Sequence, residues 1–207
     1  MVGDRGRVAF NNNTGTVEVQ SGTLAFNGGF TQTAGATRLA GGALAFASHD
    51  FQGGWITGSG TINTSLNNTG AVLNPGNSPG TIVIAGDYWQ GPGAAMLIEL
   101  AGAGSGLHDL VRVLGTANLG GTLEVALLDG LRPGLGDTFH FLDFAARNGQ
   151  FNTVEVAGGT GYEFNAVYSS GGVDLVTTVV PEPATLCLLA IVTCCLAGSF
   201  WWLRKRQ

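Results

Sequence analysis

The residues best suited to acid–base chemistry lie between Asp137 and Asp143, a stretch with two carboxylates and the imidazole of His140. Two carboxylates can cleave a glycosidic bond when they lie about 5–9.5 Å apart. Because strand side chains alternate between faces, we expect both acids to share a face with Phe139 and Phe141, and His140 to lie on the other. Six residues along a strand separate the acids by about 20 Å. The stretch therefore favours strand-end acids around a buried phenylalanine pair, with a solvated histidine.

A second candidate pair is His108-Asp109, in which a base could be followed by the group that orients it. Adjacent side chains on a strand point to opposite faces, so these two are expected to diverge. Asp109 follows the glycine-rich segment 104–106 and is better placed to cap that turn. The pair is therefore expected to serve the fold rather than catalysis.

A candidate glycan contact is Trp55, which follows His49-Asp50 and a predicted loop over residues 51–55. Its ring could stack on a sugar, although a packing role is favoured. The histidines lack metal-ligand spacing, and no nucleophile elbow or phosphate loop occurs. A polysaccharide lyase would need clustered acids with a basic residue, and residues 1–180 contain no Lys and scattered Arg. The sequence predicts no catalytic, metal or cofactor-binding site, and so no enzyme.

The C-terminal part of the sequence contains one long apolar run. Residues 184–203 form a 20-residue run without charge. A helix of that length rises about 1.5 Å per residue and spans the roughly 30 Å hydrocarbon core of a bilayer. The basic cluster Arg204, Lys205 and Arg206 follows and should stay on the cytoplasmic side, which places residues 1–180 on the other side. The sequence predicts one transmembrane α-helix.

The triplet Pro181-Glu182-Pro183 directly precedes this run. The triplet, the apolar helix and the basic cluster, in this order, resemble the PEP-CTERM sorting signal. The resemblance implies export by a Gram-negative bacterium, processing by an exosortase (a transpeptidase-like membrane enzyme) and association with extracellular polysaccharide. Pro181, Glu182 and Pro183 would then form the sorting and cleavage motif, and the basic cluster would supply the stop-transfer charges. An ordinary single-pass anchor is the alternative.

Proteins with this signal carry an N-terminal signal peptide, which the first seven residues do not resemble. Charges occupy positions 4, 5 and 7, and no apolar stretch of 7 or more residues follows them. We therefore expect the true start of the reading frame to lie upstream. Insertion through the tail alone would instead leave most of the chain inside the cell.

Composition excludes several classes of function. Residues 1–180 carry 13 of the 14 acids but 6 of the 9 basic residues, and so a net charge of −7. Such a surface repels phosphates, and we expect no binding of nucleic acid. The three cysteines all lie in the apolar run, so the rest of the chain has no disulfide and no thiolate metal site.

Residues before the tail form short strand-like units that begin with Gly and a small residue. Glycine makes up 35 of the 207 residues, against a usual share of about 7%. The units begin at Gly22, Gly42, Gly60 and Gly80, with a further one at Gly121 after about two periods. Recurrence near 20 residues is typical of a solenoid, and the alternation of apolar with small or polar residues predicts half-buried strands.

These units predict an all-β parallel β-helix, in which each coil buries its apolar face on its neighbours. Asparagines at 11–13 and 67–68 could stack as amide ladders between coils. A β-sandwich and glycine-rich disorder are the alternatives. Gly70 to Ile84, with its Pro-Gly-x-Ser-Pro-Gly-Thr segment, and parts of 86–154 resemble autotransporter-type passenger repeats. That resemblance implies a right-handed β-helix and an adhesive or matrix role on a bacterial surface.

The chain is expected to divide into three parts. Residues 1–105 form β-helix coils, residues 106–180 form wider terminal coils or a β cap with longer strands, and residues 181–207 form the sorting signal. The expected function is that of an exported, non-catalytic structural or adhesive protein, held in the cell envelope by residues 184–203. After processing it would reach the cell surface or extracellular matrix. An exopolysaccharide-binding protein and a carbohydrate-active β-helix enzyme are the alternatives.

Overall fold

The computed structural model describes residues 8–76, 79–158 and 160–180. These residues form strands joined by turns and loops, and the prediction of an all-β fold is confirmed. Among them, no helix is long and apolar enough to cross a membrane. The predicted transmembrane helix, the sorting motif and the basic cluster lie outside the described residues. The strands are β1 (Phe10–Asn12), β2 (Thr16–Val19), β3 (Thr23–Phe26), β4 (Phe30–Gln32), β5 (Ala36–Phe46), β6 (His49–Phe51), β7 (Trp55–Ile62), β8 (Leu66–Asn68), β9 (Val72–Pro75), β10 (Thr81–Ile84), β11 (Tyr88–Gln90), β12 (Ala95–Leu100), β13 (Leu110–Leu119), β14 (Thr122–Leu127), β15 (Thr138–Gly149), β16 (Thr153–Val156), β17 (Glu163–Tyr168) and β18 (Gly172–Val179).

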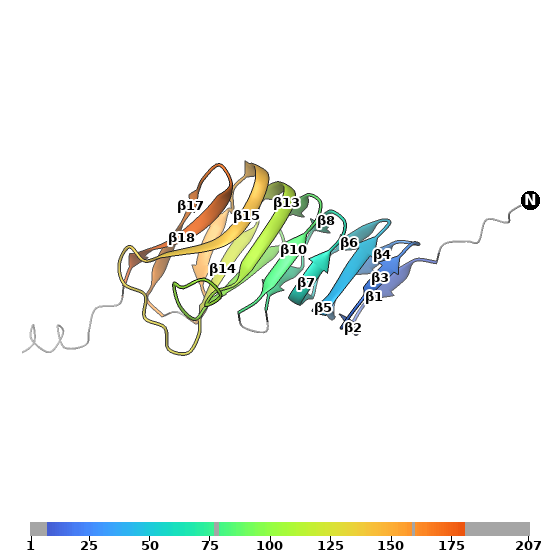
Figure 1. The fold of residues 1–207 in the computed structure, drawn as a ribbon, viewed down its shortest axis with the longest axis horizontal. Coiled ribbons are helices and arrows are strands. Elements are labelled where there is room, and N and C mark those ends of the chain that lie inside the picture. Colours follow the sequence, from blue (N-terminus) through green and yellow to red (C-terminus); the bar gives the residue numbers. More distant parts are fainter. Residues whose placement is uncertain (1–7, 77–78, 159, 181–207) are drawn as a thin grey trace, which may run out of the picture.

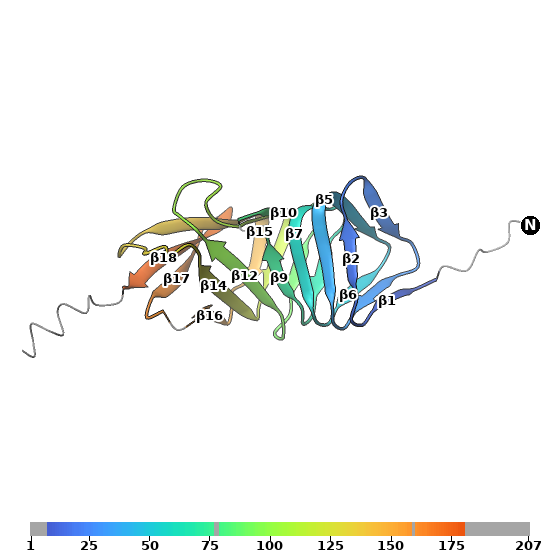
Figure 2. The same cartoon turned by 90° about the horizontal axis from the view of Figure 1, so that it is seen from below.

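Parallel pairing arranges β1 to β16 in three faces, and the chain visits each face once before it returns to the first. Face I contains β2, β5, β7, β9, β12, β14 and β16, which lie side by side in Figure 2. Face II contains β3, β10 and parts of β5, β7, β13 and β15. Face III contains β1, β4, β6, β8, β11 and the ends of β13 and β15. The strands follow one another along the long axis of the molecule (Figure 1), an arrangement compatible with a β-helix. One passage through the three faces is called a coil below.

Coils are longer toward the C-terminal end of the stack than at its start. On face III, Phe10 pairs with Phe30, 20 residues later, whereas Tyr88 pairs with Ala117, 29 residues later. The step near 20 is therefore confirmed for the early coils. The unit at Gly121 does not continue the same row, because it leads into β14 on face I rather than face II. The division of the chain at residue 105 stays a prediction.

The core lies between the three faces. Alternation in strands such as β10 and β12 buries every second side chain, and these form one apolar cluster with members from β2 to β18. In the early coils phenylalanines align from coil to coil. The Phe10 and Phe30 rings are parallel to within 6°, with centroids 5.6 Å apart, and Phe26 and Phe46 repeat this at 5.7 Å. The apolar side chains of each coil therefore pack on those of the next coil, and the buried core continues along the stack.

Buried amides join successive coils where face III meets face I: Asn12, Gln32, Asn68 and Gln90. The Asn12 side chain donates to Gln32 Oε1 at 3.2 Å. Gln32 Nε2 donates in turn to the carbonyls of Gly53 and Trp55, at 2.9 and 3.2 Å. Gln90 makes the equivalent contacts to Gly120 and Thr122, at 2.9 and 3.0 Å. The predicted amide ladder is therefore confirmed at Asn12, and Phe51 interrupts it where it pairs with Gln32.

Glycines stack at the same corner, at Gly15, Gly35 and Gly54. Backbone N–H groups of Ala36 and Trp55 donate to the carbonyls of Gly15 and Gly35, each at 2.9 Å. Gly35 and Gly54 have φ values of +78° and +76°. A Cβ at either position would lie 2.2 or 2.3 Å from the carbonyl oxygen of the glycine in the preceding coil. The close coil spacing at this corner therefore depends on glycine.

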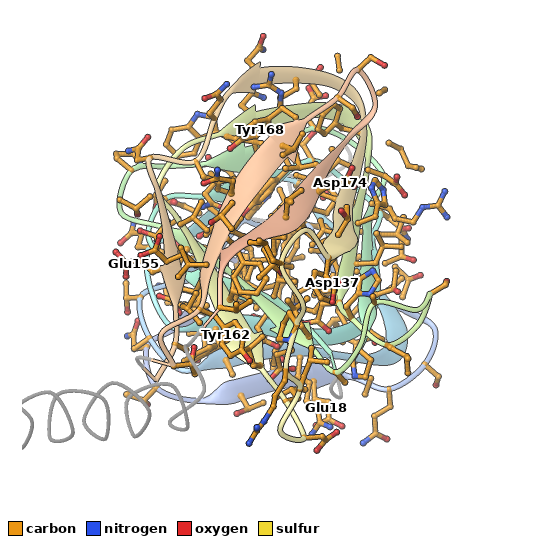
Figure 3. All side chains as sticks on the ribbon, turned by 90° about the vertical axis from the view of Figure 1, so that its left-hand side faces the viewer. Glu18, Asp137, Glu155, Tyr162, Tyr168 and Asp174 are labelled. Atoms are coloured by element: carbon orange, nitrogen blue, oxygen red, sulfur yellow. The ribbon has the colours of Figure 1, made fainter. Side chains whose placement is uncertain are left out.

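An antiparallel hairpin, β17–β18, lies at the C-terminal end of the stack. Its second strand pairs with β15 in antiparallel register, as His140 with Asp174 and Phe139 with Leu175. Phe164 of β17 and Leu175 of β18 are buried. Figure 3 looks along the stack from this end and shows both strands crossing it, with Asp174 on one of them. The hairpin thus covers apolar side chains of the last coils.

Candidate functional site

The strongest concentration of titratable side chains centres on His140. The register between β15 and β18 shifts between His140 and Leu142, so Phe141 and Leu142 are both buried. This irregularity returns Asp143 to the same side as His140. The prediction that these two side chains lie on opposite faces is therefore wrong, because a bulge breaks the period of two that the prediction assumed. The predicted burial of Phe139 and Phe141 is confirmed.

Both ring nitrogens of His140 contact carboxylates. Nδ1 lies 2.6 Å from Asp174 Oδ1, and Nε2 lies 2.8 Å from Asp143 Oδ1. The Arg112 Nε lies 3.2 Å from the second oxygen of Asp143. Partial burial lowers the pKa of His140, but the hydrogen bonds to the two carboxylates outweigh that effect and raise it. A protonated ring donates to both acids, so this cluster is an ion-pair network that joins β15 to β18 and β13.

Two members of this cluster were not predicted from the sequence. Asp174 lies 34 residues after His140 and reaches it through the antiparallel pairing of β18 with β15. Arg112 reaches Asp143 because β13 pairs with β15 in parallel, with these two residues in register. Neither partner lies near His140 in the sequence. Only the pairing of the strands could have identified them.

A shallow pocket of about 510 Å³ lies beside this cluster, where the loop between β12 and β13 projects from the stack (Figure 2). Its lining includes His108, His140, Ser105 and Thr138. His108 Nε2 lies 2.9 Å from the His140 carbonyl oxygen, and its Nδ1 lies 3.2 Å from that of Gly102. Both ring nitrogens of His140 contact carboxylates, whereas both of His108 face carbonyl oxygens, to which a neutral ring can donate from one nitrogen only.

Asp109 lies apart from His108, as the alternation of strand side chains predicts, but it does not cap the turn at 104–106. Its side chain is fully buried and accepts hydrogen bonds from the backbone N–H groups of Gly80, at 2.7 Å, and Glu99, at 2.9 Å. The predicted capping role is therefore wrong, because the carboxylate turns inward and joins the start of β10 to β12. Burial raises the pKa of Asp109 to about 7.

Asp109 should make stability depend on pH. Because its folded pKa is about 7 and its ordinary value is 3.8, the folded protein holds this proton where the unfolded chain has lost it. The resulting stabilisation is complete below 3.8 and is lost as the pH rises to about 7. We expect Asp109→Asn to remove this dependence. The measurement is the free energy of unfolding of both proteins between these two pH values. Asp129→Asn, at an exposed turn, is the control and should leave the slope unchanged, and an unchanged slope in Asp109→Asn would contradict the assignment.

The other candidate residues are dispersed. Asp137 accepts a hydrogen bond from the Gly134 N–H at 2.8 Å and lies in the turn before β15, outside the His140 cluster. His49 accepts a hydrogen bond from the Asn67 N–H at 2.7 Å, and burial lowers its pKa. The predicted loop over 51–55 is shorter than expected, because Phe51 is buried in β6 and Trp55 begins β7. These residues form no common site.

Trp55 is 46% exposed on face I. Its partners in the adjacent strands are Ala36 and Val72. Neither side chain can form a hydrogen bond with a sugar hydroxyl. The role of Trp55 as a glycan contact stays a prediction.

Comparison with known proteins adds no identification. No protein-family model matches the chain, and no curated protein matches it. Within the described ranges, no group of three His, Cys, Asp or Glu side chains is arranged to hold a metal ion.

Proposed function

We propose that this chain is an exported, non-catalytic structural or adhesive protein that is sorted and processed through a PEP-CTERM tail. The observation that carries the proposal is the order of three elements at the C-terminus. Pro181-Glu182-Pro183, an uncharged run over 184–203 and the basic cluster follow one another without interruption. The first is the element that an exosortase would recognise, the second crosses the membrane, and the third stops transfer. The protein first stands in the cell envelope and then joins the cell surface or the extracellular polysaccharide matrix.

The ectodomain in this proposal is a right-handed parallel β-helix with a C-terminal β cap. The three-face parallel pairing supports the β-helix, and the antiparallel β17–β18 hairpin supports the cap. A stack of coils joined by backbone hydrogen bonds, buried amides and aligned phenylalanines is stable without a ligand. Such a rod suits a structural role, because its length grows with the number of coils and its outer faces stay free for contacts.

Binding of exopolysaccharide is the second candidate function, and exposed tryptophans on two faces favour it. An aromatic ring on a flat polar surface can stack against the apolar face of a sugar. The net charge of −7 on residues 1–180 argues against nucleic acid as a partner. The catalytic alternative has less support, because both ring nitrogens of His140 already contact carboxylates.

An epitope placed at the Asp129-Gly130 turn tests the location of the ectodomain. Both residues are exposed, and a side chain at Gly130 would meet no atom within 4 Å, so an insertion there should be tolerated. In a Gram-negative host with an exosortase, antibody should label the epitope on intact cells or in the matrix fraction. The same epitope on a cytoplasmic protein, labelled after lysis alone, is the control. Labelling of the ectodomain that also requires lysis would refute the proposal.

A further inference from the structure

Trp89 forms an open aromatic platform on face III. Its side chain is 42% exposed. A Cβ on Gly91 would lie 2.8 Å from two carbons of the six-membered part of its ring. The ring therefore extends over the glycine two residues further along the same edge of the sheet. One part of the ring thus rests on the backbone at Gly91, while less than half of the side chain is open to solvent.

Polar side chains surround this ring on three neighbouring strands. In the parallel register Trp89 pairs with Asn67 on one side and with Asn118 on the other. Asp87 lies two residues before Trp89 and so points to the same side of the sheet. Ser65 and Thr116 flank Asp87, through a 3.0 Å bond from the Asp87 N–H to Ser65 Oγ and a 2.7 Å bond from the Thr116 N–H to Asp87 Oδ1. We call these six residues the Trp89 patch: Ser65, Asn67, Asp87, Trp89, Thr116 and Asn118.

Several hydrogen-bonding groups of the Trp89 patch have no partner in the part of the chain that the structure describes. The Asn67 side chain makes no hydrogen bond there. Asn118 is held from both sides, because its Nδ2 donates to the Tyr88 carbonyl at 3.3 Å and its Oδ1 accepts from Asn148 at 2.9 Å. One N–H of that amide stays free. The patch therefore combines an apolar ring face with fixed donors and acceptors beside it.

The charge of the patch excludes anionic partners. Asp87 is its one charged member, and none of its six residues is Lys or Arg. A polyanion such as a uronic acid polymer or a nucleic acid would meet a carboxylate with no cation to offset it. The patch is thus complementary to an uncharged chain rich in hydroxyl groups, with one carboxylate as a hydrogen-bond acceptor.

The row formed by Asn67, Trp89, Asn118 and Asn148 crosses the strands. Neighbouring strands lie about 4.8 Å apart, so two steps along the row cover about 9.6 Å, a length comparable to one disaccharide of an extended chain. A flat surface of this kind fits a ribbon-like glycan better than a coiled one.

We propose that the Trp89 patch binds an extended neutral polysaccharide, whose chain crosses the strands of face III and stacks one sugar ring on Trp89. The inference rests on the proposed function, because it names the class of matrix glycan that the exported protein would contact. Binding is separate from tail processing. A chain that is processed and fails to bind would refute this inference alone.

Calorimetric titration of the full chain tests the patch. The neutral probes are cellohexaose and mannohexaose, and the anionic probe is hexagalacturonate. We expect at least one neutral probe to bind, and hexagalacturonate to bind about tenfold more weakly or not at all. Trp89→Ala should weaken the neutral interaction about tenfold or more, as loss of a central aromatic contact does. Leu135→Ala, the control, removes an apolar side chain that is 71% exposed in the turn before β15, outside the patch, and should leave affinity unchanged.

Asn67→Ala keeps the test valid if Trp89→Ala disturbs folding. Its side chain makes no hydrogen bond to the described residues, so the melting temperature should not change, while affinity should fall roughly threefold through the loss of one hydrogen bond. The proposal is overturned if neither neutral probe binds, if hexagalacturonate binds as tightly, or if Leu135→Ala weakens binding as much as Trp89→Ala. Unchanged affinity in both Asn67→Ala and a folded Trp89→Ala would also overturn it.

Discussion

Gly54→Ala is expected to lower the free energy of unfolding by roughly 3–5 kcal/mol, a large part of the total stability of a domain. Two effects add at this position. The backbone has φ +76°, which a residue with a Cβ rarely adopts. The new methyl group would also lie 2.3 Å from the Gly35 carbonyl oxygen, an atom fixed by its own hydrogen bond to Trp55 N–H. Relief of this overlap requires the coils to move apart.

Gly22→Ala separates these two effects. Gly22 has φ +67°, but a Cβ there would meet no atom within 4 Å. The substitution should therefore cost about 1 kcal/mol, the strain of the backbone alone. The measurement is chemical denaturation of the full-length wild type and both variants at one temperature, followed by circular dichroism. Equal losses in the two variants would show that coil contact at Gly54 contributes nothing.

Strands of faces I and II could be predicted from the sequence. Each predicted unit, from the one at Gly22 to the one at Gly121, coincides with a strand or with part of one. The signal is strong because four or more residues alternate between apolar and polar, and because glycine marks each corner. The same regularity led to a wrong row for the unit at Gly121. In the sequence, a step of two short periods cannot be distinguished from one longer coil followed by a change of face.

The short strands of face III could not be predicted in the same way. β4, β6, β8 and β11 have three residues each, too few to show a period of two. Gln32 and Gln90 are buried there, although glutamine is ordinarily an exposed residue. Their burial is explained by the backbone carbonyls that accept hydrogen bonds from their side-chain amides. Face III also carries Trp89, so the same lack of signal concealed the most distinctive polar surface of the chain.

The His140 cluster shows the limit of strand periodicity. Its residues could be listed as candidates from their types, but the face of each side chain depended on an irregularity between His140 and Leu142. A bulge of this kind adds one residue and leaves no marked signature in composition. The predicted capping role of Asp109 was wrong for a related reason. Its buried position depends on the backbone N–H groups of Gly80 and Glu99, which only the stacking of coils brings together.

Loss of the C-terminal tail should be complete and should depend on an exosortase. Residues 181–207 are 27 of the 207 residues, so cleavage near Pro181-Glu182-Pro183 removes about one eighth of the chain. Glu182→Ala, a change of one side chain in the proposed recognition element, should block the reaction while it leaves the described residues unaltered. The uncleaved variant should then stay with the membrane fraction, because the apolar run at 184–203 is retained.

The most direct test is the intact mass of the protein, expressed behind a signal peptide in two hosts that differ only in the exosortase. We predict a protein about one eighth lighter in the host with the enzyme, and the full-length chain in the other host and in Glu182→Ala. Identical masses in the two hosts would contradict the account.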